Sequence, residues 1–196
     1  LGLGHLELCV IAEELGRFLA PVPFSSSVYL FTEAIINYGT DEIKEDILPK
    51  LVSGEIVGTL AVTEDLHAPT KNNINLSYAN GKINGKKIAV PDAGVATHAV
   101  VVAKSNKGIS LQLVDLSATG VTTEHQENID ESRGHFSITF NDVETQLLGD
   151  EVNGWELYES LINQAAVLFS YEQIGGSQAS LDMAINYAKE RYAFGR

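Results

Sequence analysis

The chain has 196 residues, 44% of them hydrophobic, and its 26 acidic and 13 basic side chains give a net charge of −13. This charge argues against nucleic-acid binding through clustered Lys and Arg, and no run of about 18 apolar residues could span a membrane. The sequence opens without a basic-then-apolar leader, so we expect a cytoplasmic protein. Because it starts at Leu1 rather than methionine and stops at Arg196 directly after a helix terminator, we expect a fragment.

The N-terminal part of the chain predicts three helices. Residues 5–19 carry apolar side chains at helical spacing, and the single cysteine, Cys9, lies on the apolar side, where we expect a buried structural thiol. A second helix is expected to be capped by the hydroxyl groups of residues 25–27. A third runs from its cap at Thr40 to a left-handed stop at Gly54.

The pattern then changes to short β-rich runs. Strand-like segments separated by turns lie at residues 57–63, 100–102, 109–114 and 136–140. Asn80-Gly81 and Asn84-Gly85 are tight-turn signals. This spacing predicts an antiparallel barrel or sandwich of about six to eight strands.

The last part of the chain predicts one long helix from Trp155 to Arg191, with Gly175-Gly176 as its weak point. The expected fold is therefore α+β, with N-terminal helices, a central antiparallel β-barrel or sandwich and a long C-terminal helix. The expected domains comprise residues 1–56, 57–150 and 151–196.

The end of the long helix reads Arg-x-x-Phe-Gly from Arg191 to Gly195. Together with the order of helices, β unit and long helix, this ending resembles the acyl-CoA dehydrogenase family. The resemblance covers the whole chain and implies a truncated form of that fold: the end of the N-terminal helical domain, the whole middle β domain and the first helix of the C-terminal domain.

The resemblance also implies an activity. Members of the family bind FAD and carry out α,β-dehydrogenation of an acyl-CoA thioester, an oxidoreductase reaction in fatty acid or lipid metabolism. The implied partners are the acyl-CoA thioester, an electron-transfer flavoprotein and further subunits of a homo- or hetero-oligomer, either a dimer or a tetramer. No metal-binding motif accompanies these features.

Residues 60–64, Leu-Ala-Val-Thr-Glu, are similar to the first flavin-contacting segment of the family. The resemblance implies that Leu60, Val62 and Thr63 contact the cofactor. Flavin N5 and the pyrimidine oxygen gain charge on reduction, so backbone amides and a hydroxyl group must hold them. The alternative interpretation is an ordinary strand end at which Thr63 caps a turn.

The sequence departs from the family pattern directly after this segment. Ala68-Pro69 stands where the family has Gly-Ser, and proline has no amide hydrogen to donate to a phosphate. Either Thr70 replaces that donor or the pocket is weaker. Pro69 and Thr70 are therefore the implied substrate-binding positions.

Residues 85–93 are similar to the second flavin segment, Gly-x-Lys-x-Trp-Ile-Thr-Asn. The resemblance implies cofactor contacts from Ala89, Val90 and Pro91. Ala89 replaces the Trp that stacks on the flavin, and Pro91 replaces the hydrogen-bonding Thr. The alternative is a β-hairpin with a Pro-Asp turn.

Arg191 and Phe194 carry the terminal motif. In the family this arginine reaches the diphosphate of a flavin that is bound mainly by the neighbouring subunit, and the phenylalanine packs by its adenosine half. A guanidinium fork suits a pyrophosphate. The alternative is a helix-end arginine that interacts with the helix dipole, with Phe194 filling a core.

The catalytic base of most family members is a carboxylate in the C-terminal helices, which places it beyond Arg196. We therefore expect that this chain alone lacks the base and cannot turn over. The losses at Pro69, Ala89 and Pro91, and at Ala166 where the family has a coenzyme A-binding arginine, also fit a non-catalytic partner subunit of a heteromeric acyl-CoA dehydrogenase. A third interpretation is a β-barrel ligand-binding or interaction module with helical flanks.

Overall fold

The computed structural model describes residues 4–130, 132–192 and 194–195. The chain divides into two compact units, one within residues 1–21 and 164–196 (unit 1) and one of residues 22–163 (unit 2). Helix α4 (Gly154–Glu190) contributes its first residues to unit 2 and the remainder to unit 1. None of the helices that the structure describes is long and apolar enough to cross a membrane.

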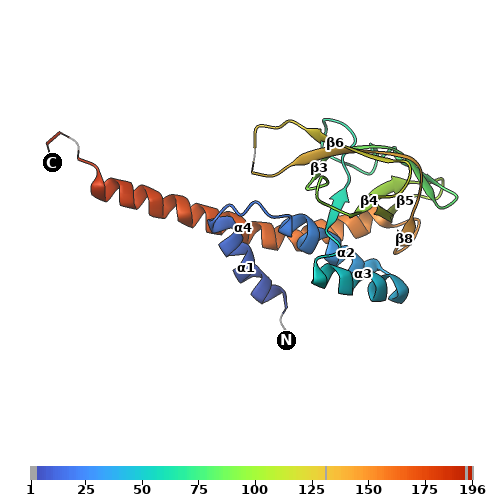
Figure 1. Ribbon diagram of the computed structural model, residues 1–196, viewed down its shortest axis with the longest axis horizontal. Coiled ribbons are helices and arrows are strands. Elements are labelled where there is room, and N and C mark those ends of the chain that lie inside the picture. Colours follow the sequence, from blue (N-terminus) through green and yellow to red (C-terminus); the bar gives the residue numbers. More distant parts are fainter. Residues whose placement is uncertain (1–3, 131, 193, 196) are drawn as a thin grey trace. The chain divides into compact units, whose positions relative to one another are not determined.

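The elements follow the predicted order of helices, β unit and long helix (Figure 1). The helices before the β unit are α1 (His5–Arg17), η1 (Ser25–Thr32), α2 (Glu33–Tyr38) and α3 (Asp41–Ser53). The strands are β1 (Gly58–Ala61), β2 (Ser77–Ala79), β3 (Lys82–Pro91), β4 (His98–Lys104), β5 (Ile109–Asp115), β6 (Val121–Gln126), β7 (His135–Glu144) and β8 (Gln146–Leu148). The predicted domain boundaries at residues 56 and 150 stay a prediction. Both lie within unit 2, which contains η1, α2 and α3 together with the strands.

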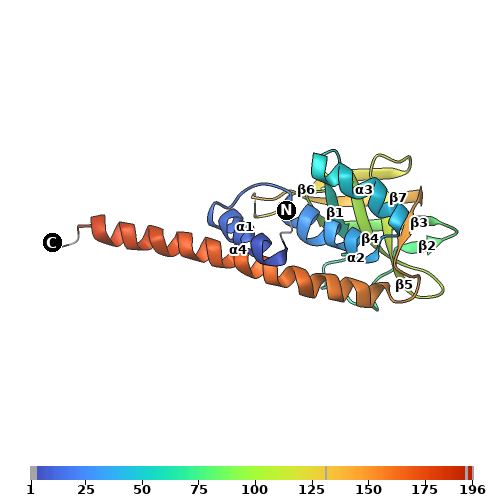
Figure 2. The same ribbon diagram turned by 90° about the horizontal axis from the view of Figure 1, so that it is seen from below.

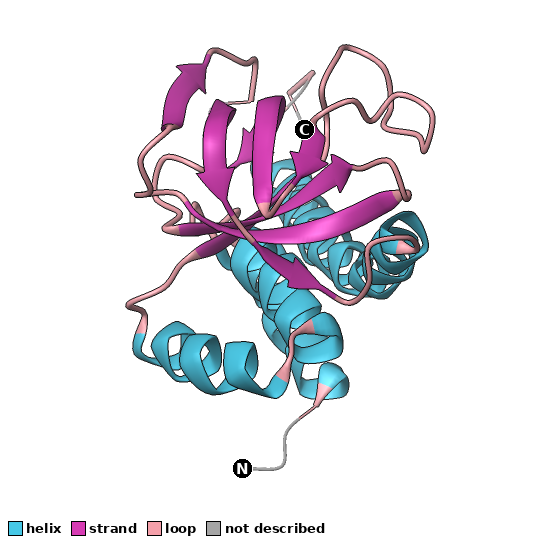
Figure 3. Cartoon of the chain, turned by 90° about the vertical axis from the view of Figure 1, so that its right-hand side faces the viewer, coloured by secondary structure: helices cyan, strands magenta, loops and turns pink. Residues whose placement is uncertain are grey.

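The strands of unit 2 form one mixed sheet (Figure 3). Their order is β6-β7-β3-β2-β4-β5-β8, with β1 beside β4. Most neighbours are antiparallel, as predicted, but β1 and β2 pair parallel to β4. The pairings between the described strands do not close the sheet into a barrel. The β2–β3 hairpin lies between β1 and β4 in the chain and provides the long connection that a parallel pair needs.

Strand β4 lies at the centre of the sheet and is buried on both faces. Residues 99–103 are all fully buried, which explains why this segment is a continuous apolar run rather than an alternating one. Helix η1 packs against β1, where a Cβ atom on Gly58 would lie 2.0 Å from Phe31 Cγ. Only glycine allows these two elements to approach so closely.

The structure corrects the predicted cap of the second helix. Residues 25–27 lie inside the π-helix η1, and its N-cap residue makes no side-chain cap hydrogen bond. The hydroxyl groups are instead used at long range: Ser26 donates to the carboxylate of Asp92, and Ser27 Oγ accepts from Gly58 N at 3.2 Å. The serine run that predicts a helix cap from its local sequence therefore connects η1 to the β unit through the hydrogen bonds of Ser26 and Ser27.

Three of four local signals elsewhere in unit 2 are confirmed. Thr40 Oγ1 accepts from Ile43 N and caps α3, which ends at the left-handed Gly54. Asn80-Gly81 forms the tight β2–β3 turn, with φ of 53° and 77°. Asn84-Gly85, by contrast, lies inside β3, where the register with β7 shifts, so it marks a bulge rather than a turn.

Unit 1 is a close crossing of α1 and α4 (Figure 2). A Cβ atom on Gly175 would lie 1.8 Å from Glu13 O, and one on Gly16 would lie 1.9 Å from Glu172 O. Helix α4 is continuous through Gly175-Gly176, so these glycines are not a weak point but the place where the helices approach. Cys9 is buried as predicted.

Candidate functional site

The two predicted flavin segments lie side by side in unit 2. Ile88 N donates to Thr63 O at 2.8 Å, and Thr59 Oγ1 donates to Pro91 O at 2.6 Å. These two hydrogen bonds join the end of β1 to the end of β3. Segments that are far apart in the sequence therefore form one continuous surface of backbone.

The predicted site residues divide into buried and accessible side chains. Leu60, Val62 and Val90 are buried in the core, so only their backbone could contact a ligand. Thr63 and Pro91 are half-buried, and Ala89 is exposed. The side chains available to a ligand at this place are thus those of Thr63, Ala89 and Pro91.

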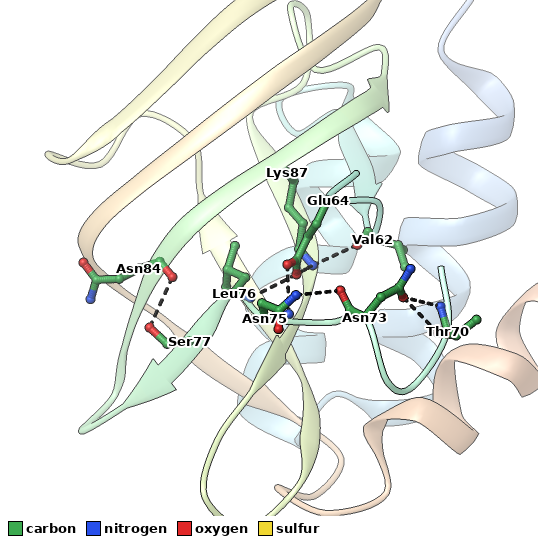
Figure 4. Close-up of polar contacts among 9 residues, drawn as sticks. All are labelled: Val62, Glu64, Thr70, Asn73, Asn75, Leu76, Ser77, Asn84 and Lys87. Carbon is green, nitrogen blue, oxygen red and sulfur yellow. Dashed lines mark hydrogen bonds and ion pairs between the residues drawn. The ribbon is translucent and has the colours of Figure 1, made fainter. Parts of the chain in front are cut away.

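A buried ion pair between Lys87 and Glu64 also joins these two segments (Figure 4). Lys87 Nζ donates to Val62 O at 2.8 Å and to Glu64 Oε1 at 2.6 Å, and the lysine side chain has no exposed surface. Burial lowers the pKa of Lys87 to about 8, against the raising effect of the Glu64 carboxylate. The ammonium group is therefore mainly charged at neutral pH.

Glu64 uses both carboxylate oxygens to hold the end of the following loop, residues 65–75. Asn75 N donates to Oε2 at 2.8 Å, and Leu76 N donates to Oε1 at 3.0 Å. One carboxylate thus accepts hydrogen bonds from two backbone amides and from the Lys87 ammonium (Figure 4). Charge-assisted bonds of this kind are stronger than those between neutral groups.

Glu64 and Lys87 lie within the two segments that resemble the family motifs, but the sequence alone assigns neither of them a role. The available signal was strand alternation, because Lys87 has the same parity in β3 as the buried Ile83. A lysine at an inward position of a strand needs a buried partner. The identity of that partner depends on the approach of β1 and could not be read from β3 alone.

The loop after Glu64 is ordered by its own hydrogen bonds. Thr70 N donates to Asn73 Oδ1 at 2.6 Å, and the Thr70 hydroxyl reaches the same oxygen at 3.1 Å. Asn73 in turn donates to Ala68 O at 3.1 Å. Both donors of Thr70 are thus directed at Asn73, whereas Pro69 beside it has no amide hydrogen to offer.

Ala89 occupies an irregular position at the end of β3. Its φ is 50°, and the register with β7 shifts between Lys87 and Val90. Its amide donates to Gln126 Oε1, on β6, at 2.7 Å. Gln126 is a second residue that sequence analysis missed, because only the bulge brings the two groups together.

Arg191 and Phe194 lie in unit 1, beyond the last residue of α4. The Arg191 guanidinium carbon is 5.6 Å from the ring centroid of Tyr187, within its own helix segment. Phe194 is fully exposed, so in this chain it does not fill a core. Both side chains are accessible to another molecule.

At the β1–β3 surface a flavin would meet fewer donors than the family pattern supplies. Among the described residues we find no hydrogen bond from the Thr63 amide or hydroxyl, so both can serve a ligand. The side chain of Ala89, in the second segment, is exposed. Pro69 and Pro91 contribute no donor. Across the part of the chain that the structure describes, no cluster of His, Cys, Asp or Glu could hold a metal ion.

Comparison with known proteins gives consistent matches. Residues 1–55 match the family model for "Acyl-CoA dehydrogenase, N-terminal domain". The mitochondrial isovaleryl-CoA dehydrogenase of Solanum tuberosum is 29% identical over 212 residues, which cover 100% of this chain and 52% of the relative. The chain thus spans about half the length of the curated relatives it matches.

Solved structures agree along the whole chain. The crystal structure of an acyl-CoA dehydrogenase from Geobacillus kaustophilus has a TM-score of 0.91 and 25% identity, and covers 100% of this chain and 56% of that one. The FAD complex of PigA has a TM-score of 0.86 and 24% identity, and covers 99% of this chain and 55% of the other. The order of helices, β unit and long helix is thus shared with these proteins.

Proposed function

We propose that the chain, which is similar to acyl-CoA dehydrogenases along its whole length, is part of an FAD-dependent enzyme of that family that dehydrogenates an acyl-CoA thioester between its α and β carbons. The observation that carries this proposal is the approach of the β1 and β3 ends, which leaves the Thr63 amide and hydroxyl without a hydrogen bond to any described residue. FAD, when bound, supplies the hydride acceptor of the reaction.

Within this proposal the residues of unit 2 hold one edge of the cofactor. Thr63 donates hydrogen bonds to the polar edge of the ring, where charge develops on reduction. The buried side chains of Leu60, Val62 and Val90 exclude water from beneath it. The open side of Ala89 and the proline at position 91 give a looser grip than an aromatic residue and a threonine would give.

The remaining functions are assigned to groups outside unit 2. Arg191 and Phe194 are proposed to contact the diphosphate and adenosine parts of an FAD held mainly by a neighbouring protomer, which requires an oligomer. The base that removes the α-proton is proposed to lie outside residues 1–196, so this segment alone would not turn over. Electron transfer to an electron-transfer flavoprotein and a cytoplasmic location belong to the same proposal.

The test is anaerobic addition of acyl-CoA thioesters to the full-length protein loaded with FAD. Reduction of the flavin by an acyl-CoA, seen as loss of its yellow absorbance, is the expected result. Thr63→Val should weaken FAD binding about tenfold, the equivalent of about 1.4 kcal/mol for one lost hydrogen bond. Thr63→Ser, which keeps the hydroxyl group, should bind nearly as the wild type does. Equal affinities of the two variants would argue against a hydrogen bond from the Thr63 hydroxyl to the flavin.

A second candidate function is that of a non-catalytic partner subunit in a heteromeric acyl-CoA dehydrogenase. The missing donors at Pro69 and Pro91 and the engagement of both Thr70 donors by Asn73 favour it. Such a subunit would keep the packing and offer Arg191 to its neighbour without holding a flavin itself. Near-stoichiometric FAD in the protein purified alone supports the enzyme, and its absence supports the partner subunit.

A further inference from the structure

Lys87 is a fully buried cation shared between two segments of the candidate site. Its Nζ contacts the backbone carbonyl of Val62 at 2.8 Å and the carboxylate of Glu64 at 2.6 Å. Burying a charged group is costly even when it is paired, and an apolar side chain often fills such a place equally well. Packing alone therefore does not account for a lysine at this position.

Glu64 extends this contact to the far end of the loop of residues 65–75. The carboxylate accepts both the Asn75 and the Leu76 amides, so the beginning and the end of the loop are joined through one side chain. Lys87, on β3, donates a further hydrogen bond to the same carboxylate (Figure 4). The ammonium thus fixes the point from which the loop leaves and the point to which it returns.

We propose that Lys87 is a positioning residue, which holds the Val62–Glu64 backbone and, through Glu64, the loop of residues 65–75 in the arrangement that the cofactor surface requires. The part of this inference that concerns the cofactor rests on the proposed function. The part that concerns the backbone does not. The Lys87 side chain has no exposed surface, and the hydrogen bonds of its ammonium group to residues that the structure describes go to Val62 and Glu64.

The chain contains a matched control on the same strand. Lys86 precedes Lys87, but its side chain is half exposed and lies 3.6 Å from Glu124 in a surface ion pair. Lys86→Met removes the same charge from β3 without touching the buried network. Surface pairs of this kind contribute little to stability, so this variant should behave as the wild type does.

The test compares backbone amide exchange, resolved by residue, in the full-length wild type, Lys87→Met, Lys87→Gln, Glu64→Gln and Lys86→Met. Lys87→Met keeps the length and apolar stem of the side chain, and Lys87→Gln keeps an N–H donor without the charge. The Asn75 and Leu76 amides should exchange about tenfold faster than in the wild type when either Lys87 or Glu64 is replaced. This change is equivalent to a loss of about 1.4 kcal/mol in the free energy of local opening. Amides of β4 and β5 should keep the wild-type rate, as should Asn75 and Leu76 in Lys86→Met.

A second readout follows the cofactor. In the FAD-loaded protein, the visible circular dichroism of the flavin should change in Lys87→Met and Glu64→Gln but not in Lys86→Met. A residue that serves only global stability would not produce this selective change, because the folded population would hold the flavin as before.

Two results would overturn the inference. In the first, Asn75 and Leu76 keep their exchange rates when Lys87 is replaced; in the second, all amides of unit 2 accelerate equally, which would make Lys87 a general stabilising residue. If Lys87→Met does not fold, Lys87→Gln and Glu64→Gln decide the same question. Failure of the proposed function is seen separately, as a wild type that binds no FAD, and the exchange experiment is unaffected by it.

Discussion

Replacing Lys87 should remove a specific pH dependence of stability. The folded pKa of Lys87 is lowered by burial to about 8 from its ordinary value of 10.5. Between these two values the unfolded chain binds a proton that the folded chain has released, so raising the pH favours the folded state. The free energy of unfolding should therefore rise across this window and be constant, for this group, on either side of it.

The expected size follows from the two pKa values. At about 1.36 kcal/mol for each pKa unit, a change from 10.5 to about 8 corresponds to about 3 kcal/mol. Lys87→Met has no group to titrate, so the difference in unfolding free energy between wild type and variant should shift in favour of the wild type by this amount. The shift should level off above about pH 10.5, where the unfolded lysine has also lost its proton.

Urea denaturation at a series of pH values, followed by the fluorescence of Trp155, measures this difference. Trp155 is the single tryptophan of the chain and is buried in unit 2. Subtracting the variant from the wild type cancels the titration of all other groups, and Lys86→Met should retain the wild-type slope. A wild-type minus Lys87→Met difference that stays constant between about pH 7 and about pH 10.5 would refute the assigned burial of a charged lysine.

Three further predictions concern backbone geometry. Gly175→Ala should lower the free energy of unfolding of unit 1 by about 2 kcal/mol in urea denaturation, because its Cβ atom would meet Glu13 O. The control Gly176→Ala should be neutral or slightly stabilising, because a Cβ atom there would lie 3.4 Å from its nearest neighbour. Equal effects of the two substitutions would contradict the close helix crossing. Ala89→Gly should raise the melting temperature, because it relieves a φ of 50°, and a lower melting temperature would contradict this. Ala89→Trp should bind FAD about fivefold more tightly by adding about 1 kcal/mol of ring stacking, measured by flavin fluorescence titration, and unchanged affinity would argue against a ring beside position 89.

The sequence predicted those features that depend on neighbouring residues. The cap at Thr40, the stop at Gly54 and the turn at Asn80-Gly81 each follow from one side chain or one backbone preference, and the structure has all three. The order of helices, strands and long helix followed from changes in hydrophobic period. These signals are local, so they do not depend on contacts with distant parts of the chain.

The features that sequence analysis missed depend on contacts between distant segments. The hydroxyl groups of Ser26 and Ser27 bind Asp92 and Gly58 instead of capping a helix. Gly175 serves a crossing with α1 rather than a break in α4. The parallel pairing of β1 with β4 has no signature within either strand, because alternation reports burial and not direction.

In the candidate site, too, the sequence predicts local motifs but not the contacts between distant segments. The motif residues of the two flavin segments were predicted from their resemblance to the family, and the structure places the two segments together. The buried Lys87–Glu64 pair and the Gln126 contact to Ala89 each need an approach of two strands before they can be recognised. Which residues actually contact FAD stays a prediction.

The measurement that tests the central claim most directly is amide exchange of the full-length protein with and without saturating FAD. The account predicts that FAD slows exchange of the backbone at residues 60–64 and 88–92, where the ends of β1 and β3 meet, and leaves β8 unchanged. FAD that binds without protecting either segment, or that protects only residues elsewhere in the chain, would contradict the assignment of the cofactor to this surface.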